Sequence, residues 1–287
     1  MIKLQCPAKI NLFLKVLDKR PDGYHNLESL FAFLSLHDIL EISKSDKFQL
    51  EISGKFADLI DLKNNIFLPI LDYFSKEFQI SKNLKINLIK NIPIGAGLGG
   101  GSSDAASLMK ALNKIFSLNL DKKNLQKISL NFGSDIAFFF EDKASIVKGR
   151  GEIIENYNQN FGAIKTLLIY PNLHLSSKEI FTKFGNNFSQ EISNDELQKI
   201  GVFDLINNIE NDLTKAAISS DFIIDKVLIA LKKEKAKIAK MSGSGSVCFG
   251  IFEDENQLEI ACNNLKEKFP EFFIERSEIL MSFLNEV

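Results

Sequence analysis

Glycine dominates one short stretch of this chain, the sequence "PIGAGLGGGSSDAA" at residues 93–106. Five of the seven residues from 95 to 101 are glycine. Because glycine loses more backbone entropy on folding than any other residue, so dense a run needs a compensating role. Close approach of the backbone to an anion provides one, since bare N–H groups can then point at phosphate oxygens. The run therefore predicts a phosphate-binding loop.

A helix is predicted directly after the glycine run. Apolar residues recur at three- and four-residue steps between Ala105 and Ile115, as on one face of an amphipathic helix. Ser102 or Ser103 is the expected N-cap, and both hydroxyls could bond a phosphate oxygen or a magnesium ion. Asp104 would repel a phosphate, so we expect it to turn away, to cap the helix or to reach a bound metal.

Three other interpretations of the glycine run are possible. A Walker A loop needs a lysine after its last glycine, and Ser102 and Ser103 stand there instead, which excludes it. Residues 95–100 fit the dinucleotide fingerprint G-x-G-x-x-G, and Asp121 lies about 20 residues further on. However, the strand predicted over 84–90 alternates polar and apolar residues, whereas the strand before that fingerprint is apolar throughout. A flexible surface loop is the remaining alternative.

A loop that holds a nucleoside triphosphate is the favoured interpretation. Its backbone amides and the dipole of the following helix would form the anion site. The residues expected to line this site are Pro93, Ile94, Gly95, Ala96, Gly97, Leu98, Gly99, Gly100, Gly101, Ser102 and Ser103.

Charge and composition restrict the possible partners. The chain has 287 residues, 35 of them basic and 37 acidic, and a formal net charge of −2. So balanced a charge argues against broad nucleic-acid binding but permits a local basic pocket for one phosphorylated small molecule. The three cysteines are far apart in the sequence and the three histidines are scattered, which argues against a metal site built from cysteines or from histidines.

The chain is expected to be a soluble cytoplasmic protein. Lys9 and Asn11 interrupt the apolar run near the start, unlike the continuous core of a signal peptide. The most apolar stretches, "LFAFLSL" and "IAFFF", are far shorter than the ~20 residues that span a bilayer. We expect the thiols to be reduced. We expect no membrane partner and no nucleic-acid partner.

Strands and helices alternate along the chain, which predicts an α+β fold with small, partly antiparallel sheets. Strands are predicted over residues 9–17, 38–43, 47–53, 84–90, 165–170, 236–241, 247–252 and 272–277. Further helices are predicted over residues 65–78, 121–132, 222–234 and 255–268. The polar, aperiodic stretch at residues 155–163 suggests a boundary between two domains, residues 1–158 and 159–287.

Motifs along nearly the whole chain resemble one family. "PAKINLFLKV" and "RPDGYHNLESLF" stand near the start, the glycine run and "GSDIAFF" in the middle, and "MSGSGSVCFGIF" near the end. Together they resemble the galactose, homoserine, mevalonate and phosphomevalonate kinases. The resemblance implies a nucleotide-binding α+β domain, a ferredoxin-like α+β C-terminal domain, an active site in the cleft between them, and ATP with Mg2+ as cofactors.

A carboxylate that accepts a hydroxyl proton and a nearby cation are what a kinase acting on an alcohol requires. Asp135 precedes the apolar block 136–140, and Lys9 lies in an apolar strand where an idle charge is unexpected. The resemblance implies that this pair is catalytic. On the residues alone, Asp135 could equally be a helix cap and Lys9 a surface lysine. The family has a proline where this chain has Ala137, which would loosen the loop but leave the carboxylate in place.

An aromatic ring and a ring nitrogen follow the turn "RPDG", at Tyr24 and His25, where they could stack on a base and hydrogen-bond it. The resemblance implies that both contact the cytosine of a cytidyl diphosphate sugar alcohol. It also places Asn11 near the sugar-alcohol end and Phe181 opposite Tyr24, so that the two rings sandwich the base. Alternatively, each of these four residues has only a structural role, in the core or in a turn.

The glycine–serine segment 242–246 lies between two predicted strands. Its glycines would let the backbone approach the substrate phosphates or the glycine run, or they form only a tight turn. His37 and His174 are assigned to structural roles.

The resemblance implies ATP-dependent phosphorylation of the 2-hydroxyl of that cytidyl diphosphate sugar alcohol, in the non-mevalonate isoprenoid pathway. A kinase of the same fold that acts on homoserine or a mevalonate derivative is the nearest alternative. A nicotinamide-dependent oxidoreductase and a catalytically silent nucleotide-binding regulator represent other classes. The "DGYH" segment argues against the first alternative, and the presence of both Lys9 and Asp135 argues against the silent regulator.

Overall fold

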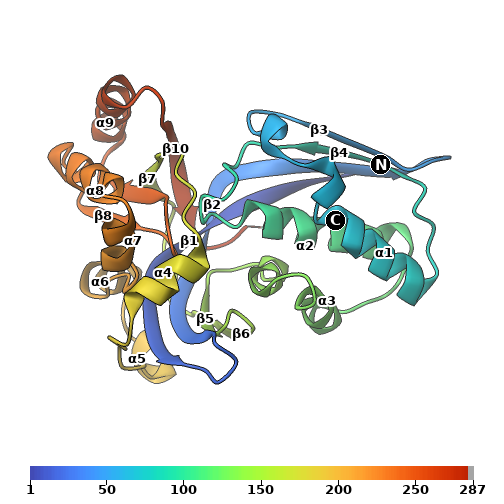
Figure 1. Cartoon of the computed structure of the whole chain (residues 1–287), viewed down its shortest axis with the longest axis horizontal. Coiled ribbons are helices and arrows are strands. Elements are labelled where there is room, and N and C mark those ends of the chain that lie inside the picture. Colours follow the sequence, from blue (N-terminus) through green and yellow to red (C-terminus); the bar gives the residue numbers. More distant parts are fainter. Residues whose placement is uncertain (284–287) are drawn as a thin grey trace.

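One ten-stranded mixed sheet runs through the molecule, as shown by a computed structural model that describes residues 1–283 (Figure 1). The two longest strands, β1 (Ile2–Lys19) and β2 (His25–Lys44), form an antiparallel hairpin that extends from one end of the molecule to the other. From β2 the sheet continues on one side through β4 and β3, and on the other through β10, β7, β9 and β8. The predicted α+β class is confirmed.

The remaining N-terminal elements lie along the hairpin, some beside its open end and others beside its turn (Figure 1). Their strands are β3 (Gln49–Ser53), β4 (Leu84–Ile89), β5 (Ser145–Gly149) and β6 (Ile153–Asn156). Their helices are α1 (Phe67–Phe78), α2 (Gly100–Ile115) and α3 (Lys122–Ser129), with 3-10 turns at Ala57–Leu59, Leu62–Asn64 and Ser134–Phe140. Only β3 and β4 pair in parallel within the described sheet.

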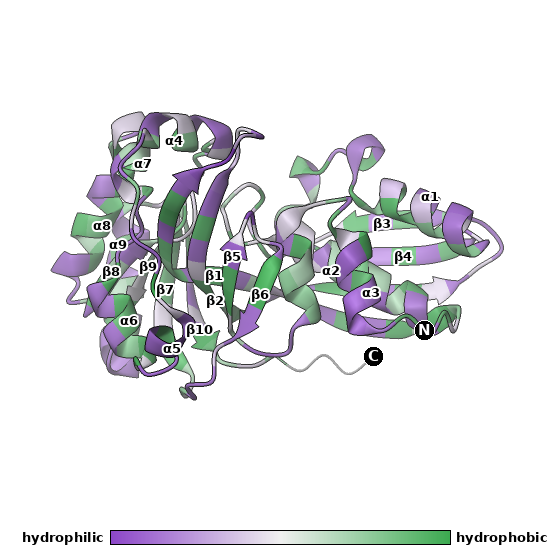
Figure 2. Cartoon of the chain, turned by 90° about the horizontal axis from the view of Figure 1, so that it is seen from below, coloured by the Kyte–Doolittle hydropathy of each residue, from purple (hydrophilic) through white to green (hydrophobic). Residues whose placement is uncertain are grey.

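The C-terminal elements lie on the left in Figure 1. Their strands are β7 (Ile164–Tyr170), β8 (Ile238–Met241), β9 (Cys248–Ile251) and β10 (Phe273–Leu280). Their helices are α4 (Ser177–Phe184), α5 (Asn194–Leu197), α6 (Val202–Asn208), α7 (Thr214–Ser220), α8 (Ile223–Lys233) and α9 (Glu255–Lys268). Figure 2 shows that helices such as α3 and α8 carry both apolar and polar residues, and their apolar faces pack inward.

Two local expectations were wrong. The expected small sheets are instead one large sheet, because β10 pairs with both β2 and β7 and joins the two halves. The helix after the glycine run begins at Gly100, not after a serine cap. Gly99 occupies the N-cap position with a φ of 70°, and its carbonyl accepts a hydrogen bond from the Ser103 amide. A left-handed N-cap costs glycine little, so the helix can start at the run itself.

Pro69 lies in the first turn of α1, where its missing N–H would have had no helical partner. The three cysteines are buried and unpaired. Residues 157–163 form neither helix nor strand, but the boundary between domains 1–158 and 159–287 stays a prediction. Within residues 1–283, no helix combines the length and apolar character needed to cross a membrane.

Candidate active site

The glycine run forms a loop whose conformation alternates residue by residue. Gly95, Gly97 and Gly99 have φ angles of +70°, +83° and +70°, which side-chain-bearing residues adopt only with strain. The residues between them are Ala96 and Leu98, both buried. Alternating left- and right-handed backbone turns successive N–H groups toward one side, as in an anion-binding nest.

Carbonyl groups of the same loop accept hydrogen bonds from other parts of the chain. The Ile94 carbonyl accepts a hydrogen bond from the Tyr170 hydroxyl at 3.2 Å. The Ala96 and Leu98 carbonyls accept hydrogen bonds from the amides of Val247 and Lys9, at 3.2 and 2.9 Å. Strands of both halves of the chain thus fix alternate peptide groups of the loop.

The amide groups of residues 94–99, by contrast, donate to no acceptor within residues 1–283. They lie directly before the N-terminus of α2, which carries a partial positive charge. Unpaired N–H groups beside a helix N-terminus form a binding site for phosphate. The arrangement fits the anion site predicted from the sequence, and half-buried β4 is unlike the fully buried strand of a dinucleotide fold.

A substitution at Gly97 tests whether this backbone shape matters. A Cβ atom on Gly97 would lie 2.9 Å from the Gly245 carbonyl oxygen, and the φ angle is left-handed. Gly97→Ala is therefore expected to raise the KM for ATP roughly tenfold, because a left-handed alanine costs about 1–2 kcal/mol. Gly162→Ala is the control, because Gly162 lies outside this loop and its Cβ would meet nothing within 4 Å, so the KM should stay unchanged. Equal effects of the two substitutions would contradict this account.

The loop lines a cavity of about 520 Å³, which we call the loop cavity. Its other walls come from the segment between β3 and α1 and from Leu88, Phe132 and Ile136. The volume is that of a pocket for a nucleotide-sized ligand, and the lining is mostly apolar.

Beneath the helix N-terminus lies a buried charge cluster that the sequence analysis missed. Lys90 Nζ contacts Asp38 and lies 2.6 Å from Asp104 Oδ2. Asp38 also accepts hydrogen bonds from the amides of Asn91 and Ile92, just before the loop. The Asp104 side chain therefore turns away from the phosphate site, which is the first of the three possibilities expected from the sequence.

Burial dominates the protonation of this cluster. It raises the pKa of Asp104 to about 7, although the neighbouring Lys90 ammonium acts in the opposite direction. Burial lowers the pKa of Lys90, but the Asp104 and Asp38 carboxylates outweigh it and raise that pKa above its ordinary value. One lysine thus neutralises one of two buried carboxylates.

Because the pKa of Asp104 is raised in the folded state, its contribution to stability is full below about pH 4, the unfolded pKa. That contribution is lost as the pH rises to about 7. Asp104→Asn is therefore expected to reduce the loss of unfolding free energy between about pH 4 and pH 7. Urea denaturation across this range measures it, with exposed Asp72→Asn as the control. Identical pH profiles for the wild type and Asp104→Asn would contradict the assignment.

A second cavity, of about 830 Å³, adjoins the first, and we call it the acceptor cavity. Lys9 and Asp135 both line it, with Lys9 Nζ 3.7 Å from Asp135 Oδ2. Lys9 is only 4% exposed, so it does not snorkel to the surface. Asp135 is 37% exposed in its side chain and caps no helix. A helix-capping role for Asp135 and a surface position for Lys9 are thus both excluded.

Register shifts in the β1–β2 hairpin direct Lys9 into this cavity. They occur between Pro7 and Lys9 and between Asn11 and Phe13, and such irregularities re-aim side chains. Lys9 Nζ donates to Asn11 Oδ1 at 2.7 Å and lies 4.5 Å from the centre of the Phe31 ring. Burial lowers the pKa of Lys9, and the Asp135 carboxylate partly restores it.

The glycine–serine segment 242–246 joins β8 and β9 and closes the floor of the acceptor cavity. Ser242 Oγ accepts from the Asn11 amide at 3.1 Å. Gly245 packs against Gly97, so the expected approach of this segment to the glycine run is confirmed.

Aromatic side chains line the far end of the acceptor cavity. Tyr24 is 55% exposed, and the Arg150 guanidinium lies 4.0 Å from the centre of its ring. The rings of His25 and Phe181 stack on one another, with centroids 5.0 Å apart. All four side chains line this cavity, as does Asn11. The stacking of Phe181 on His25 is thus observed, whereas the sandwich of a base between Tyr24 and Phe181 stays a prediction.

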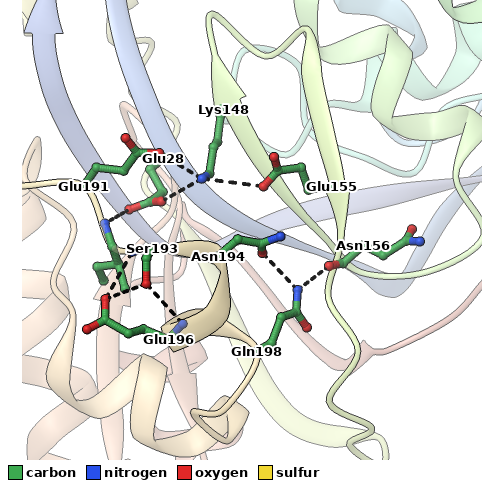
Figure 3. A network of polar contacts seen from close by, with 10 residues as sticks. Glu28, Lys148, Glu155, Asn156, Glu191, Ser193, Asn194, Glu196 and Gln198 are labelled. Carbon is green, nitrogen blue, oxygen red and sulfur yellow. Dashed lines mark hydrogen bonds and ion pairs between the residues drawn. The ribbon is translucent and has the colours of Figure 1, made fainter.

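A polar network that includes the buried Glu28 and the exposed Glu191 lies around Lys148 (Figure 3). Lys148 on β5 lies 2.9 Å from Glu191 and 3.5 Å from both Glu28 and Glu155. The Glu28 carboxylate accepts from the Ile192 amide at 3.0 Å. The network ties the segment after α4, whose first residues line the cavity, to the sheet.

The two cavities share Gly97 and Gly99 as lining residues. A Cβ on Gly99 would lie 2.9 Å from Lys9 Cγ, so the loop backbone passes directly over the lysine. A phosphoryl group held by the loop would therefore lie next to the Lys9–Asp135 pair. This geometry suits transfer between a nucleotide in one cavity and a hydroxyl in the other.

Magnesium has few direct protein ligands to draw on here. No group of three or more His, Cys, Asp or Glu side chains within residues 1–283 could hold a metal ion. Mg2+ bound with a nucleotide needs only one or two protein oxygens, since phosphates and waters supply the others. The Ser102 side chain, at the helix N-terminus in the loop cavity, fits that requirement.

His37 and His174, which were assigned to structural roles from the sequence, line neither cavity. His37 Nδ1 is 2.7 Å from the Ser35 carbonyl. His174 packs on the glycine loop, where a Cβ on Gly95 would lie 2.5 Å from its Nδ1.

Comparisons with known proteins agree with this architecture. Residues 65–142 match the GHMP kinases N terminal domain, and residues 194–271 match the GHMP kinases C terminal domain. A crystal structure of 4-(cytidine 5'-diphospho)-2C-methyl-D-erythritol kinase superposes with a TM-score of 0.80 at 24% identity, over 97% of this chain and 99% of the other. Leishmania major mevalonate kinase superposes with a TM-score of 0.69 at 14% identity, over 99% and 97%.

Curated relatives are similar over nearly their whole length. The 4-diphosphocytidyl-2-C-methyl-D-erythritol kinase of Thermoanaerobacter pseudethanolicus is 34% identical over 96% of both chains. The enzyme of the same name from the Brugia malayi Wolbachia is 33% identical over 97% of this chain and 98% of its own. With this identity over both halves of the GHMP kinase fold, the chain belongs to the 4-diphosphocytidyl-2-C-methyl-D-erythritol kinase family.

Proposed function

We propose that this chain transfers the γ-phosphoryl group of ATP to the 2-hydroxyl of 4-diphosphocytidyl-2-C-methyl-D-erythritol, in the non-mevalonate isoprenoid pathway. The observation that carries the proposal is the Lys9–Asp135 pair at the junction of the loop cavity and the acceptor cavity. The names of the curated relatives support the choice of substrate.

Asp135 acts as the general base in this proposal. It accepts the proton of the 2-hydroxyl as that oxygen attacks the γ-phosphorus, and the bond from γ-phosphorus to the bridging oxygen breaks to release ADP. Lys9 orients Asp135 and stabilises the charge that develops on the attacking oxygen. The transfer is direct, since the acceptor cavity has no other carboxylate next to Lys9 that could carry a phosphoryl group.

The glycine run, Pro93 to Ser103, holds the triphosphate through its unpaired amides and the helix N-terminus. Mg2+ bound with ATP would neutralise phosphate charge, with Ser102 as its candidate protein contact. ATP as the donor and three unpaired cysteines are consistent with the cytoplasmic location expected from the sequence.

The acceptor cavity places the two ends of the substrate. Tyr24, His25 and Phe181 contact the cytosine, and Asn11 contacts the methylerythritol end close to Lys9. Burial lowers the pKa of His25, so the neutral ring is available at pH 7 to hydrogen-bond an amide-like base edge.

Phosphorus NMR of the product tests the proposed chemistry. The chain is incubated with ATP, Mg2+ and the cytidyl substrate, and the expected product has one new phosphomonoester signal assigned to the 2-position. A phosphomonoester at a different hydroxyl would contradict the placement of the polyol beside Asp135. ATP hydrolysis with no new ester would contradict the kinase assignment itself.

A further inference from the structure

The turn between β5 and β6, residues 149–152, runs along the acceptor cavity from its aromatic end to its catalytic end. At one end the Arg150 guanidinium lies 4.0 Å from the centre of the Tyr24 ring. At the other, a Cβ on Gly151 would lie 3.5 Å from Asp135 Oδ1. Two adjacent residues thus connect the aromatic ring to the catalytic carboxylate.

The guanidinium of Arg150 has almost no partners of its own. Its nearest counter-charge is Asp22 Oδ2, at 3.9 Å from Nη1, which is beyond hydrogen-bond distance. Asp22 is engaged elsewhere, with Arg20 at 3.2 Å and the Tyr24 amide at 3.1 Å. No acceptor in the described chain receives a hydrogen bond from the Arg150 side chain, which is 41% exposed and lines the cavity. The five N–H donors of the guanidinium therefore have no protein acceptor among the described residues.

We propose that Arg150 binds the diphosphate of the acceptor substrate, an inference that rests on the proposed function. In that substrate the diphosphate lies between the base and the polyol. If the base contacts Tyr24 and the 2-hydroxyl contacts Asp135, the diphosphate must pass along the turn that joins them. A guanidinium matches phosphate oxygens in a two-pronged geometry that a lysine cannot reproduce.

Two further cations, Lys19 and Lys178, also line the aromatic half of the cavity. They raise its positive potential but arise from β1 and α4, not from the turn. Arg150 is thus the cation that makes the cavity selective for an alcohol carrying a nucleoside diphosphate over a plain alcohol or amino acid.

Calorimetric titration of cytidine and CDP tests this assignment. A saturating, non-hydrolysable ATP analogue with Mg2+ is present throughout, so that the probes reach only the acceptor cavity. Arg150→Leu is expected to weaken CDP binding about 10- to 100-fold, the range for lost hydrogen bonds to a charged group, and to leave cytidine binding within about twofold. Arg150→Lys should lie between them. The KM for the full substrate should rise with little change in kcat.

Arg276→Leu is the matched control, because Arg276 pairs with Glu255 on the surface and lines neither cavity. Wild-type CDP affinity in Arg150→Leu would overturn the assignment and leave the proposed function standing. Equal losses for cytidine and CDP would also overturn it, since Arg150 would then only support Tyr24. Failure of the wild type to bind either probe would instead overturn the proposed base recognition, and the diphosphate assignment with it.

Discussion

Replacing Asp135 with asparagine is expected to lower kcat by about 10²- to 10⁴-fold, the usual contribution of a general base. Asparagine keeps the shape of the side chain but cannot accept the hydroxyl proton. The affinity for ATP should change less than about twofold, since in the proposed function backbone amides and the helix N-terminus hold the triphosphate. Initial rates of ADP release and a titration with a non-hydrolysable ATP analogue measure the two quantities.

Ser134→Ala is a suitable control for this experiment. Its hydroxyl is 3.5 Å from Asp135 Oδ1, so the change touches the same surface without removing the base. The control should retain kcat within about threefold, because the bond it loses is long and weak. A kcat of Asp135→Asn that matched the control would exclude Asp135 as the base. A large loss of ATP affinity would indicate damage to the glycine loop instead.

Replacing Lys90 with methionine is expected to lower the free energy of unfolding by about 3–5 kcal/mol, as when one partner of a buried ion pair is removed. Lys90 is only 3% exposed, and its ammonium is shared by Asp38 and Asp104. Without it, two carboxylates would remain in the interior with no counter-ion. Asp38 also holds the amides that lead into the glycine loop, so weaker ATP binding should accompany the loss of stability.

Urea denaturation at pH 7 measures the effect. Lys85→Met is the control, because Lys85 is an exposed lysine on the same strand, β4, and should change stability by less than about 0.5 kcal/mol. A similar small change for Lys90→Met would mean that the cluster is hydrated and contributes little. Because Asp104 is the second carboxylate on one lysine, the double variant with Asp104→Asn should recover part of the loss.

Much of the fold could be predicted because its periodicities are local. Strands β7 and β9 and helices α8 and α9 fall within a few residues of their predicted limits. The full length of β2 could not be predicted, because residues 30–34 are buried on both faces and show no alternation. The pairing of β10 with β2 could not be predicted either, since it joins residues about 240 positions apart without any local signal.

The candidate site divides in the same way. The glycine run was visible because its glycine density is an anomaly within the sequence itself, whereas the roles of Lys9 and Asp135 were implied only by the resemblance to a kinase family. Lys90 ends a half-polar strand and Arg150 follows a glycine, so neither is anomalous where it stands. Their significance comes from tertiary partners: two buried carboxylates for Lys90, and an aromatic ring beside a cavity for Arg150.

ATP turnover by the purified chain, with four alcohols offered separately, tests the central claim most directly. The alcohols are the cytidyl substrate, methylerythritol phosphate, homoserine and mevalonate. We expect ADP release to depend on the cytidyl substrate alone. Turnover with homoserine or mevalonate would contradict the base recognition assigned to Tyr24, His25 and Phe181. No turnover with any of the four, despite ATP binding, would contradict the assignment of this chain's function as a kinase.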